Sequence, residues 1–287
     1  MGKISNTWAL VKQSFAILRQ DKELMTLPIL SAISCILVTL SLLAGSGLAF
    51  YPQIEAAMAA EGAWHPGNAL LLGAAFLFYL ANYFVIVFFN TALVSAASIR
   101  LGGGHPTVRD GLSAAWGRVG VIFQWALLAA TVGMVLRMIE GRSSLIGRLM
   151  VSLVGMAWTL ATFFVVPILA FENLGPIAAL KRSAQLFRTN WGAEVAGTFS
   201  FGLIFFLLAL PGALLPVVGG ALAGTYGVTI GAALMVVYFI VLAVVSASTH
   251  GIFLAALYRY ANQGEASQGF SRDTLSSAWQ SKSGFRD

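Results

Sequence analysis

The chain has 287 residues, of which 58% are hydrophobic and only 10% are charged. A soluble domain carries about a quarter charged residues, so this composition excludes a water-facing globular surface and indicates an integral membrane protein. The net charge of +6 first suggests nucleic acid, but the Lys and Arg are scattered at the ends of apolar segments, where membrane topology alone requires them. We therefore expect membrane lipid, and no nucleic acid, as a partner.

Residues 1–24 are predicted to form an amphipathic helix at the cytoplasmic face of the membrane. Apolar residues repeat at helical spacing on one side and cations fall on the other: Ile4, Trp8, Val11, Phe15 and Leu18 against Lys12 and Arg19. The apolar run that follows starts only near Met25, farther along than a secretory signal would place it. We expect a retained transmembrane helix there.

Long charge-free runs predict six transmembrane helices, since a helix needs about 20 apolar residues to cross a bilayer. The longest run lies between Glu194 and Arg259 and is too long for one crossing, but two prolines and clustered glycines between Pro211 and Gly227 divide it. The predicted spans are 25–51, 68–97, 119–136, 149–171, 195–218 and 229–258. The predicted fold is therefore all-α, a single polytopic membrane domain over 1–287.

Lys and Arg are distributed unequally between the two sides that six spans define. The N-terminal segment, the loops 98–118 and 172–194 and the tail 259–287 carry 14 of them (4, 3, 3 and 4). The other side carries 3, all within 137–148. Because cytoplasmic loops carry the excess of Lys and Arg, we expect both termini in the cytoplasm.

Two cytoplasmic loops contain further predicted amphipathic helices. Apolar residues recur at helical spacing in both loops: Val108, Leu112, Ala115 and Trp116 in the first, and Ile177, Leu180, Ala184, Phe187 and Trp191 in the second. Helices lying in the headgroup layer explain these patterns; a partner-binding groove or a gating collar is the alternative. The candidate headgroup contacts are Trp8, Lys12, Arg19, Lys181, Arg182 and Arg188.

Four charges interrupt the apolar sequence in RMIEGRSSLIGR, residues 137–148: Arg137, Glu140, Arg142 and Arg148. We expect an outward-facing hairpin tip, in which Glu140 pairs with Arg148 and Arg137 reaches the headgroups with its long side chain. Two alternatives stay open. One is a re-entrant helix pair that keeps these arginines cytoplasmic, and the other is a charged pore ring in an oligomer.

Polar residues inside the predicted spans are costly in lipid and usually face the interior of a helix bundle. Asn90, Gln124 and His250 fall roughly 9–15 Å from the cytoplasmic ends of their spans, at about 1.5 Å per helical residue. They form a candidate polar layer. Interhelical hydrogen bonds explain such a layer, and a path for a substrate or ion is the alternative.

The sequence lacks the patterns that catalysis needs. The three histidines, His65, His105 and His250, have no metal-ligand spacing, and the single Cys35 excludes a thiolate cluster and an intrachain disulfide. The glycines at 102–104 lack the Lys and Ser/Thr of a phosphate loop. We therefore expect no enzyme activity, no catalytic residues, no cofactor and no metal.

Two stretches, TWALVKQSFAILRQDKELMTLPILS (7–31) and the segment 102–192 that begins GGGHPTVRDGLSAAW, resemble domain-of-unknown-function family 6159. The resemblance implies a prokaryotic multi-pass protein of the bacterial or archaeal cytoplasmic (inner) membrane and brings no activity with it. We expect a channel- or transporter-like bundle for small solutes or lipids, assembled as a homo-oligomer. A non-catalytic scaffold or accessory protein that acts through the amphipathic helices is the alternative.

Overall fold

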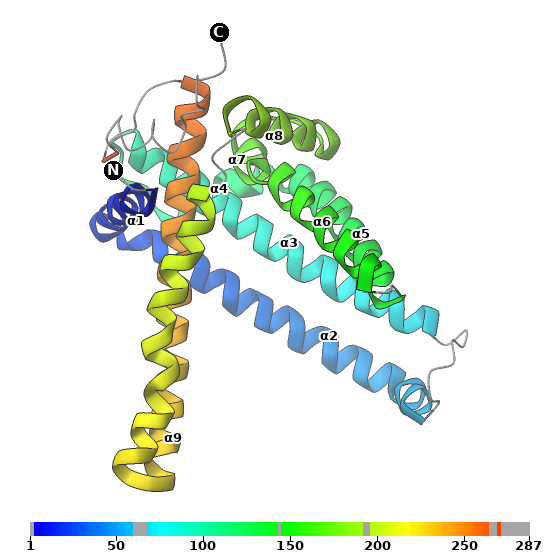
Figure 1. Ribbon diagram of the computed structural model, residues 1–287. Helices are drawn as coiled ribbons and strands as arrows, with labels where there is room; N and C mark the ends of the chain where they lie inside the picture. The colour runs from blue at the N-terminus through cyan, green and yellow to red at the C-terminus, as the bar shows by residue number, and fades with distance from the viewer. Residues whose placement is uncertain (1–2, 60–67, 143–144, 192–195, 264–268, 271–287) are drawn as a thin grey trace. The chain divides into compact units, whose positions relative to one another are not determined.

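The computed structural model describes residues 3–59, 68–142, 145–191, 196–263 and 269–270, and every element among them is a helix (Figure 1). In chain order these are α1 (Lys3–Gln20), the short 3-10 helix η1 (Lys22–Met25), α2 (Thr26–Ala59), α3 (Asn68–Leu101), α4 (Val108–Trp116), α5 (Val119–Arg142), α6 (Leu145–Ala161), α7 (Val165–Phe171), α8 (Pro176–Trp191) and α9 (Ala196–Gln263). The described residues contain no strand. The predicted all-α class is confirmed.

Five helical segments within the described ranges are long and apolar enough to cross a membrane, judged by length and composition: Lys22–Gly45, Leu72–Leu101, Val119–Glu140, Gly147–Phe171 and Gly202–Asn262. The last one contains 61 residues, whereas one crossing needs about 20. Large apolar side chains are exposed along these helices, for example Leu40 of α2 and Val217 of α9. Such exposure is costly in water and is what a lipid-facing surface requires.

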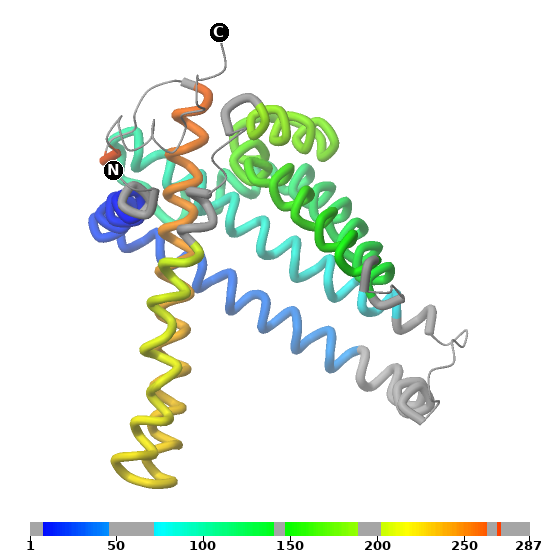
Figure 2. Tube along the Cα trace, in the orientation of Figure 1, coloured from blue at the N-terminus to red at the C-terminus, as the bar shows by residue number. Residues whose placement is uncertain are grey.

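The helix α9 turns back on itself instead of forming one straight rod (Figures 1 and 2). Its backbone leaves the helical region at Ala223 and Gly224, where Gly224 has φ +59° and ψ −141°. This combination is essentially confined to glycine, because a Cβ would collide with the backbone. The reversal falls inside the predicted turn 219–228.

Glycines let the two arms of α9 approach closely. A Cβ added to Gly227 would lie 1.8 Å from the carbonyl oxygen of Gly219, and one added to Gly231 would lie 2.4 Å from that of Leu215. Pro211 and Pro216 both lie inside the first arm, which continues through them as a helix. The glycine at the reversal, and not the prolines, therefore ends this arm.

Two predicted boundaries differ from the structure. The helix α5 continues to Arg142 instead of ending at residue 136, because charged residues end an apolar run but are themselves good helix formers. The predicted span 149–171 is divided into α6 and α7 by turns at Thr162–Phe164. Pro167 lies in the first turn of α7, where the missing N–H of a proline costs little.

The chain divides into two compact units. Unit 1 comprises Met1–Pro28, Leu93–Gly111 and Gln185–Asp287, and unit 2 comprises Ile29–Ala92 and Leu112–Ala184. In unit 1, α1 lies against α9 and is buried along Leu10, Ile17 and Leu18. In unit 2, Ala126 and Ala130 of α5 pack against Leu80 of α3, and their small side chains bring the two helices close together.

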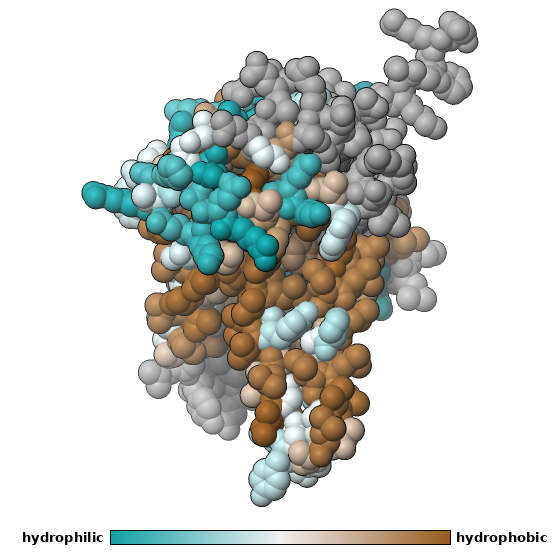
Figure 3. Space-filling model, turned by 90° about the vertical axis from the view of Figure 1, so that its left-hand side faces the viewer, coloured by the Kyte–Doolittle hydropathy of each residue, from teal (hydrophilic) through white to brown (hydrophobic). Residues whose placement is uncertain are grey.

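Hydropathy separates the described surface of unit 1 into two zones (Figure 3). Hydrophobic side chains cover most of the arms of α9, interrupted by a few weakly hydrophilic ones, and strongly hydrophilic side chains gather over α1. The helix α1 carries Lys12, Gln20 and Arg19 as exposed residues. This division is the one expected where a hydrocarbon layer meets an aqueous face.

Candidate functional site

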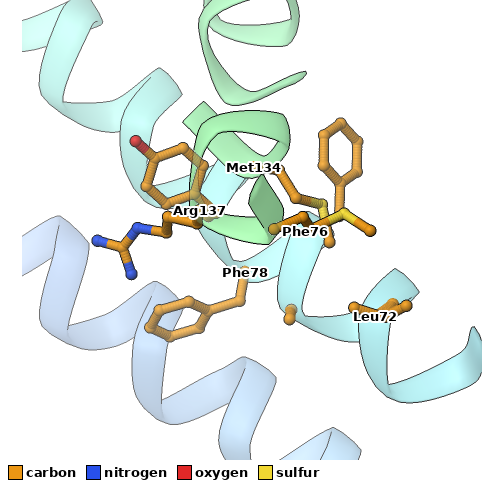
Figure 4. A pocket seen from close by; sticks show the side chains of 8 residues that line it. Leu72, Phe76, Phe78, Met134 and Arg137 are labelled. Atoms are coloured by element: carbon orange, nitrogen blue, oxygen red, sulfur yellow. The ribbon is translucent and has the colours of Figure 1, made fainter. Parts of the chain in front are cut away.

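A pocket of about 380 Å³ lies between α3 and α5 in unit 2 (Figure 4). Its volume falls in the range of small-molecule sites, roughly 300–1,000 Å³. The lining is apolar or aromatic except for one cation, and it includes Leu72, Phe76, Phe78, Tyr79, Met134 and Arg137. The pocket therefore offers an apolar cavity with a single positive charge.

The cation of the pocket is held against an aromatic ring. The guanidinium carbon of Arg137 lies 5.9 Å from the centroid of Tyr79, within the range of a cation–π contact. One turn earlier on α5, Gly133 leaves room for this ring, since a Cβ there would lie 2.9 Å from the Tyr79 hydroxyl oxygen. The glycine thus lets Tyr79 lie flat against α5 beneath Arg137.

Aromatic residues connect the pocket with α6. The rings of Tyr79 and Tyr83 are stacked with centroids 6.0 Å apart, and the side chains of Tyr83 and Trp125 share a hydrogen bond. Trp125 in turn stacks on Trp158 of α6, with centroids 6.0 Å apart and planes 2° from parallel. These contacts fix the wall of the pocket to three helices of unit 2.

A polar contact that sequence reasoning missed joins α2 and α3 in unit 2. The Thr39 hydroxyl donates to Asn82 Oδ1 at 3.2 Å, and Asn82 Nδ2 donates to the Phe78 carbonyl one turn earlier, at 3.0 Å. The Cys35 thiol also donates to the Asn82 carbonyl at 4.0 Å. The sequence could have indicated this contact, because Asn82 is a polar amide in the same apolar run as Asn90.

The candidate polar layer is not assembled within one unit. Asn90 and Gln124 belong to unit 2 and are both exposed. His250 belongs to unit 1, where its ring centroid lies 6.4 Å from that of Phe253. The layer therefore stays a prediction.

The four charges of the predicted hairpin tip lie on two helices. Arg137, Glu140 and Arg142 belong to α5, and Arg148 belongs to α6. Glu140 and Arg148 are exposed, and their pairing stays a prediction. The side chain of Arg142 and residues 143–144 lie outside the described part of the chain, as does His65.

The candidate headgroup residues are mostly exposed. The side chains of Lys12, Arg19, Lys181 and Arg188 reach the surface, and Trp8 is 53% exposed. Arg182 instead lies 3.4 Å from the Glu172 carboxylate, through its Nε. These positions suit contacts with a membrane surface, and those contacts stay a prediction.

An ion-pair cluster in unit 1 is a second feature that the sequence did not reveal. Arg100 Nε lies 2.8 Å from Asp21 Oδ2, and both side chains are more than four-fifths buried. Arg100 also donates to the side-chain oxygen of Gln20 and lies 3.5 Å from the His105 ring. Because Asp21 separates α1 from η1, the cluster joins this corner to the end of α3.

The cluster is extended by two hydrogen bonds to the backbone. Arg259, near the end of α9, donates to the Ser98 carbonyl at 3.0 Å, and the Val108 N–H at the start of α4 donates to the Glu23 carboxylate at 3.3 Å. Arg and carboxylate groups here satisfy backbone groups at helix ends, as isolated helix termini require. The arrangement is structural, and it holds no group of three or more metal-ligating residues within the described ranges.

The helices define the class of this chain: the described residues form an all-helical protein with segments long and apolar enough to cross a membrane. The model of the family of unknown function DUF6159 matches residues 69–270. The chain belongs to this family. The match covers the part from α3 to the end of α9 and leaves α1, η1 and α2 outside, and with them the stretch 7–31. No curated protein and no solved structure matches the chain.

Proposed function

We propose that this protein is a non-catalytic lipid-handling bundle of a prokaryotic cytoplasmic membrane, and that it binds an anionic phospholipid in the pocket between α3 and α5. The observation that carries the proposal is the composition of this pocket. Its lining is apolar apart from the Arg137 guanidinium and the Tyr79 hydroxyl. A polar solute would lose its hydrogen bonds to water against such walls, so the lining favours an amphiphile.

Charge, more than apolar contact, would select the lipid. An acyl chain that moves from the bilayer into the pocket exchanges one apolar environment for another, so the hydrophobic effect contributes little to its binding. The guanidinium of Arg137 pairs well with a phosphate, because its planar fork of donors matches the oxygens of the phosphate. Anionic headgroups should therefore bind more tightly than zwitterionic ones.

The proposal includes six crossings with both termini in the cytoplasm. The reversal of α9 at Ala223 and Gly224 supports the fifth and sixth crossings, because each arm is longer than the about 20 residues that a bilayer requires. The 14-to-3 distribution of Lys and Arg supports the orientation. With this topology, Arg137 would meet the headgroups of the outer leaflet.

Binding is tested by native mass spectrometry of the purified protein with added phosphatidylglycerol or phosphatidylcholine. We expect Arg137→Gln to reduce the preference for phosphatidylglycerol about fivefold, since one basic residue beside anionic lipid contributes about 1 kcal/mol. Arg148→Gln is the matched control, because it removes the same charge from the next helix without touching the pocket. An equal preference in the wild type and in Arg137→Gln would refute the site.

Handling, as distinct from binding, is tested by lipid movement in proteoliposomes. Wild-type protein should accelerate the transfer of a fluorescent phosphatidylglycerol between leaflets, and Arg137→Gln should slow that transfer at equal protein content. If lipid binds but does not move, the protein is a lipid-binding protein and the transport part of the proposal is wrong.

The scaffold alternative has one observation in its favour. Two short helices expose large apolar side chains, namely Trp116 of α4 at 70% and Ile177 of α8 at 61%. Such patches often mark contacts with a protein or a membrane surface. A scaffold should lose its function with Trp116→Glu and keep it with Arg137→Gln, which is the opposite of what lipid handling requires.

A further inference from the structure

A second cavity lies in unit 1, between α1 and the two arms of α9. It has a volume of about 440 Å³, comparable to small-molecule sites at roughly 300–1,000 Å³. The helix α1 lines it with Trp8, Lys12 and Phe15, and α9 contributes side chains from both arms, among them Leu208 and Tyr238. The cavity is therefore a groove bounded by three helical segments, called the groove below, and is not a flat surface.

The arrangement of α9 shapes one wall of this groove. The Tyr238 hydroxyl donates to the Leu208 carbonyl on the other arm. A Cβ on Gly212 would lie 2.3 Å from the Tyr238 ring, so only glycine leaves space for the ring at this point. With its hydroxyl already bonded to α9, Tyr238 presents mainly its ring to the groove. This wall is thus apolar.

The opposite wall is held in place by a different face of α1. Leu10 and Leu18 are buried at 4% and 0% exposure, whereas Trp8 is 53% exposed. The buried face holds α1 against α9, and the face with Trp8, Lys12 and Phe15 is left to line the groove. Lys12 therefore lies beside these aromatic residues, and its predicted position on the opposite side of the helix is wrong, because residues four apart share one face of a helix. The groove therefore exists without any further movement of α1.

Lys12 is the one cation among the residues that line the groove, and its side chain is exposed. Arg19, the next cation along α1, lies over the ring of Phe15, with 5.1 Å between its guanidinium carbon and the ring centroid. An ammonium beside an apolar groove suits a ligand with a hydrocarbon tail and an anionic head. The exposed indole of Trp8 suits the interfacial layer, where such a head resides.

We propose that this groove is a binding site for an anionic phospholipid, with its acyl chain between α1 and the arms of α9 and its phosphate at Lys12. The charge complementarity of Lys12 and the apolar walls select this occupant over a polar solute. The site uses no residue of the α3–α5 pocket. Either site can therefore fail without the other.

Photocrosslinking tests the groove in the full-length protein. A phosphatidylglycerol with a photoreactive group on its acyl chain is added to protein in phosphatidylcholine nanodiscs, and crosslinked peptides are located by mass spectrometry. We expect crosslinks in the α1 segment near Phe15 and in the α9 segment near Val241. Unlabelled phosphatidylglycerol should compete, whereas glycerol 3-phosphate, which has the head without the tails, should not.

Variants separate the two parts of the ligand. Lys12→Gln should reduce competition by unlabelled phosphatidylglycerol about fivefold, the effect expected of one basic residue beside anionic lipid. Val241→Trp should fill the groove and reduce crosslinking of lipids with any headgroup. Lys22→Gln is the matched control, because Lys22 is exposed in η1 and does not line the groove; it should behave as the wild type.

The proposal is overturned if crosslinks spread evenly over α9, if phosphatidylcholine competes as well as phosphatidylglycerol, or if Lys12→Gln leaves the competition unchanged. Competition by glycerol 3-phosphate would also overturn it, since a free phosphate would then be the ligand. Folding of each variant is checked by its melting temperature. Because Arg137→Gln should leave these crosslinks unchanged, failure here is distinguishable from failure of the α3–α5 site.

Discussion

Two long apolar segments contain a break in the helix, one between α6 and α7 and one inside α9, and different interactions stabilise the backbone at each break. Between α6 and α7, the N–H of Phe164 donates to the buried hydroxyl of Ser183 on α8, at 3.0 Å. At Ala223–Gly224 in α9, the chain relies on backbone freedom and on glycines that let the arms meet. One interruption is held by a side-chain hydrogen bond, and the other by the absence of side chains.

The difference follows from what the interrupted backbone needs. A break inside an apolar environment leaves N–H groups without water, so a polar side chain must reach them. A full reversal needs two arms at short distance, and a Cβ between the arms prevents that distance. We therefore expect substitutions at the reversal to cost more than substitutions at the break.

The largest effect is expected for Gly227→Ala. Its Cβ would lie 1.8 Å from a backbone oxygen, which cannot turn aside as a side chain would. The arms must separate, and we expect a cost of about 3 kcal/mol, the upper end of the usual range for overpacking, because the obstacle is backbone. Thermal unfolding in detergent measures the loss. Gly202→Ala is the control, because nothing lies within 4 Å of its Cβ position, and it should be neutral or slightly stabilising.

A smaller loss is expected for Gly224→Ala, where space is not the problem. No atom lies within 4 Å of the Cβ position, but the backbone has φ +59° and ψ −141°. Forcing alanine into this conformation costs about 1–3 kcal/mol. The same unfolding measurement checks it. A wild-type melting temperature would mean that the reversal does not depend on this conformation.

Ser183→Ala tests the other interruption. The change leaves the Phe164 N–H without its acceptor, and hydrogen bonds between membrane helices contribute about 0.6 kcal/mol on average and about 1.7 at most. Thr159→Val provides the comparison, since the Thr159 hydroxyl only bonds to the Gly155 carbonyl of its own helix. If Ser183→Ala destabilises more than Gly227→Ala, the contrast between the two interruptions is reversed.

The smallest effect on stability is expected at the N-terminus of α4, where a side chain caps the helix. Thr107 and Asp110 cap it reciprocally: the Thr107 N–H donates to Asp110 Oδ2 at 2.9 Å, and the Asp110 N–H donates to the Thr107 hydroxyl at 3.2 Å. The hydrogen bond from the Thr107 hydroxyl, followed by the one from its backbone, holds the pKa of Asp110 below its ordinary value of 3.8.

A carboxyl whose pKa is lowered by folding binds fewer protons in the folded state. Its stabilisation is therefore present above the unfolded pKa and is lost as the pH falls through the lower, folded value. Melting temperatures measured from pH 6 to pH 3 should show a small decline that Asp110→Asn abolishes in part. Asp110 is exposed, so a large decline would have to come from other carboxyls.

The sequence predicted the positions of the long apolar segments better than the ends of the helices that contain them. Predicted spans 68–97 and 229–258 lie within α3 and α9, because hydrocarbon thickness sets a minimum length that the sequence displays directly. The predicted span 119–136 likewise lies within α5, which continues past it through Arg137 and Glu140 as a helix. A charged residue thus ends an apolar run without ending the helix, because charged residues are good helix formers.

The candidate sites were less predictable than the fold. The sequence predicted Arg137 as a charge of the hairpin tip and Lys12 as a headgroup contact, and both turn out to line apolar cavities. It did not indicate that Tyr79 lies beneath Arg137, or that Asp21 pairs with Arg100. Partners of this kind come from helices that are distant in the chain, so spacing along one helix carries no signal for them.

By itself, the sequence indicated an apolar environment for this protein and the segments suited to it, because the length of an apolar run and the frequency of charged residues can be counted along the chain. Only the tertiary structure decided which face of each helix packs. The predicted apolar stripe of α1 is therefore buried only in part, since Val11 and Leu18 are covered whereas Trp8 stays exposed. Close backbone approach, as at Gly227, and polar partners, as at Ser183, decide the packing instead, because each depends on a second helix.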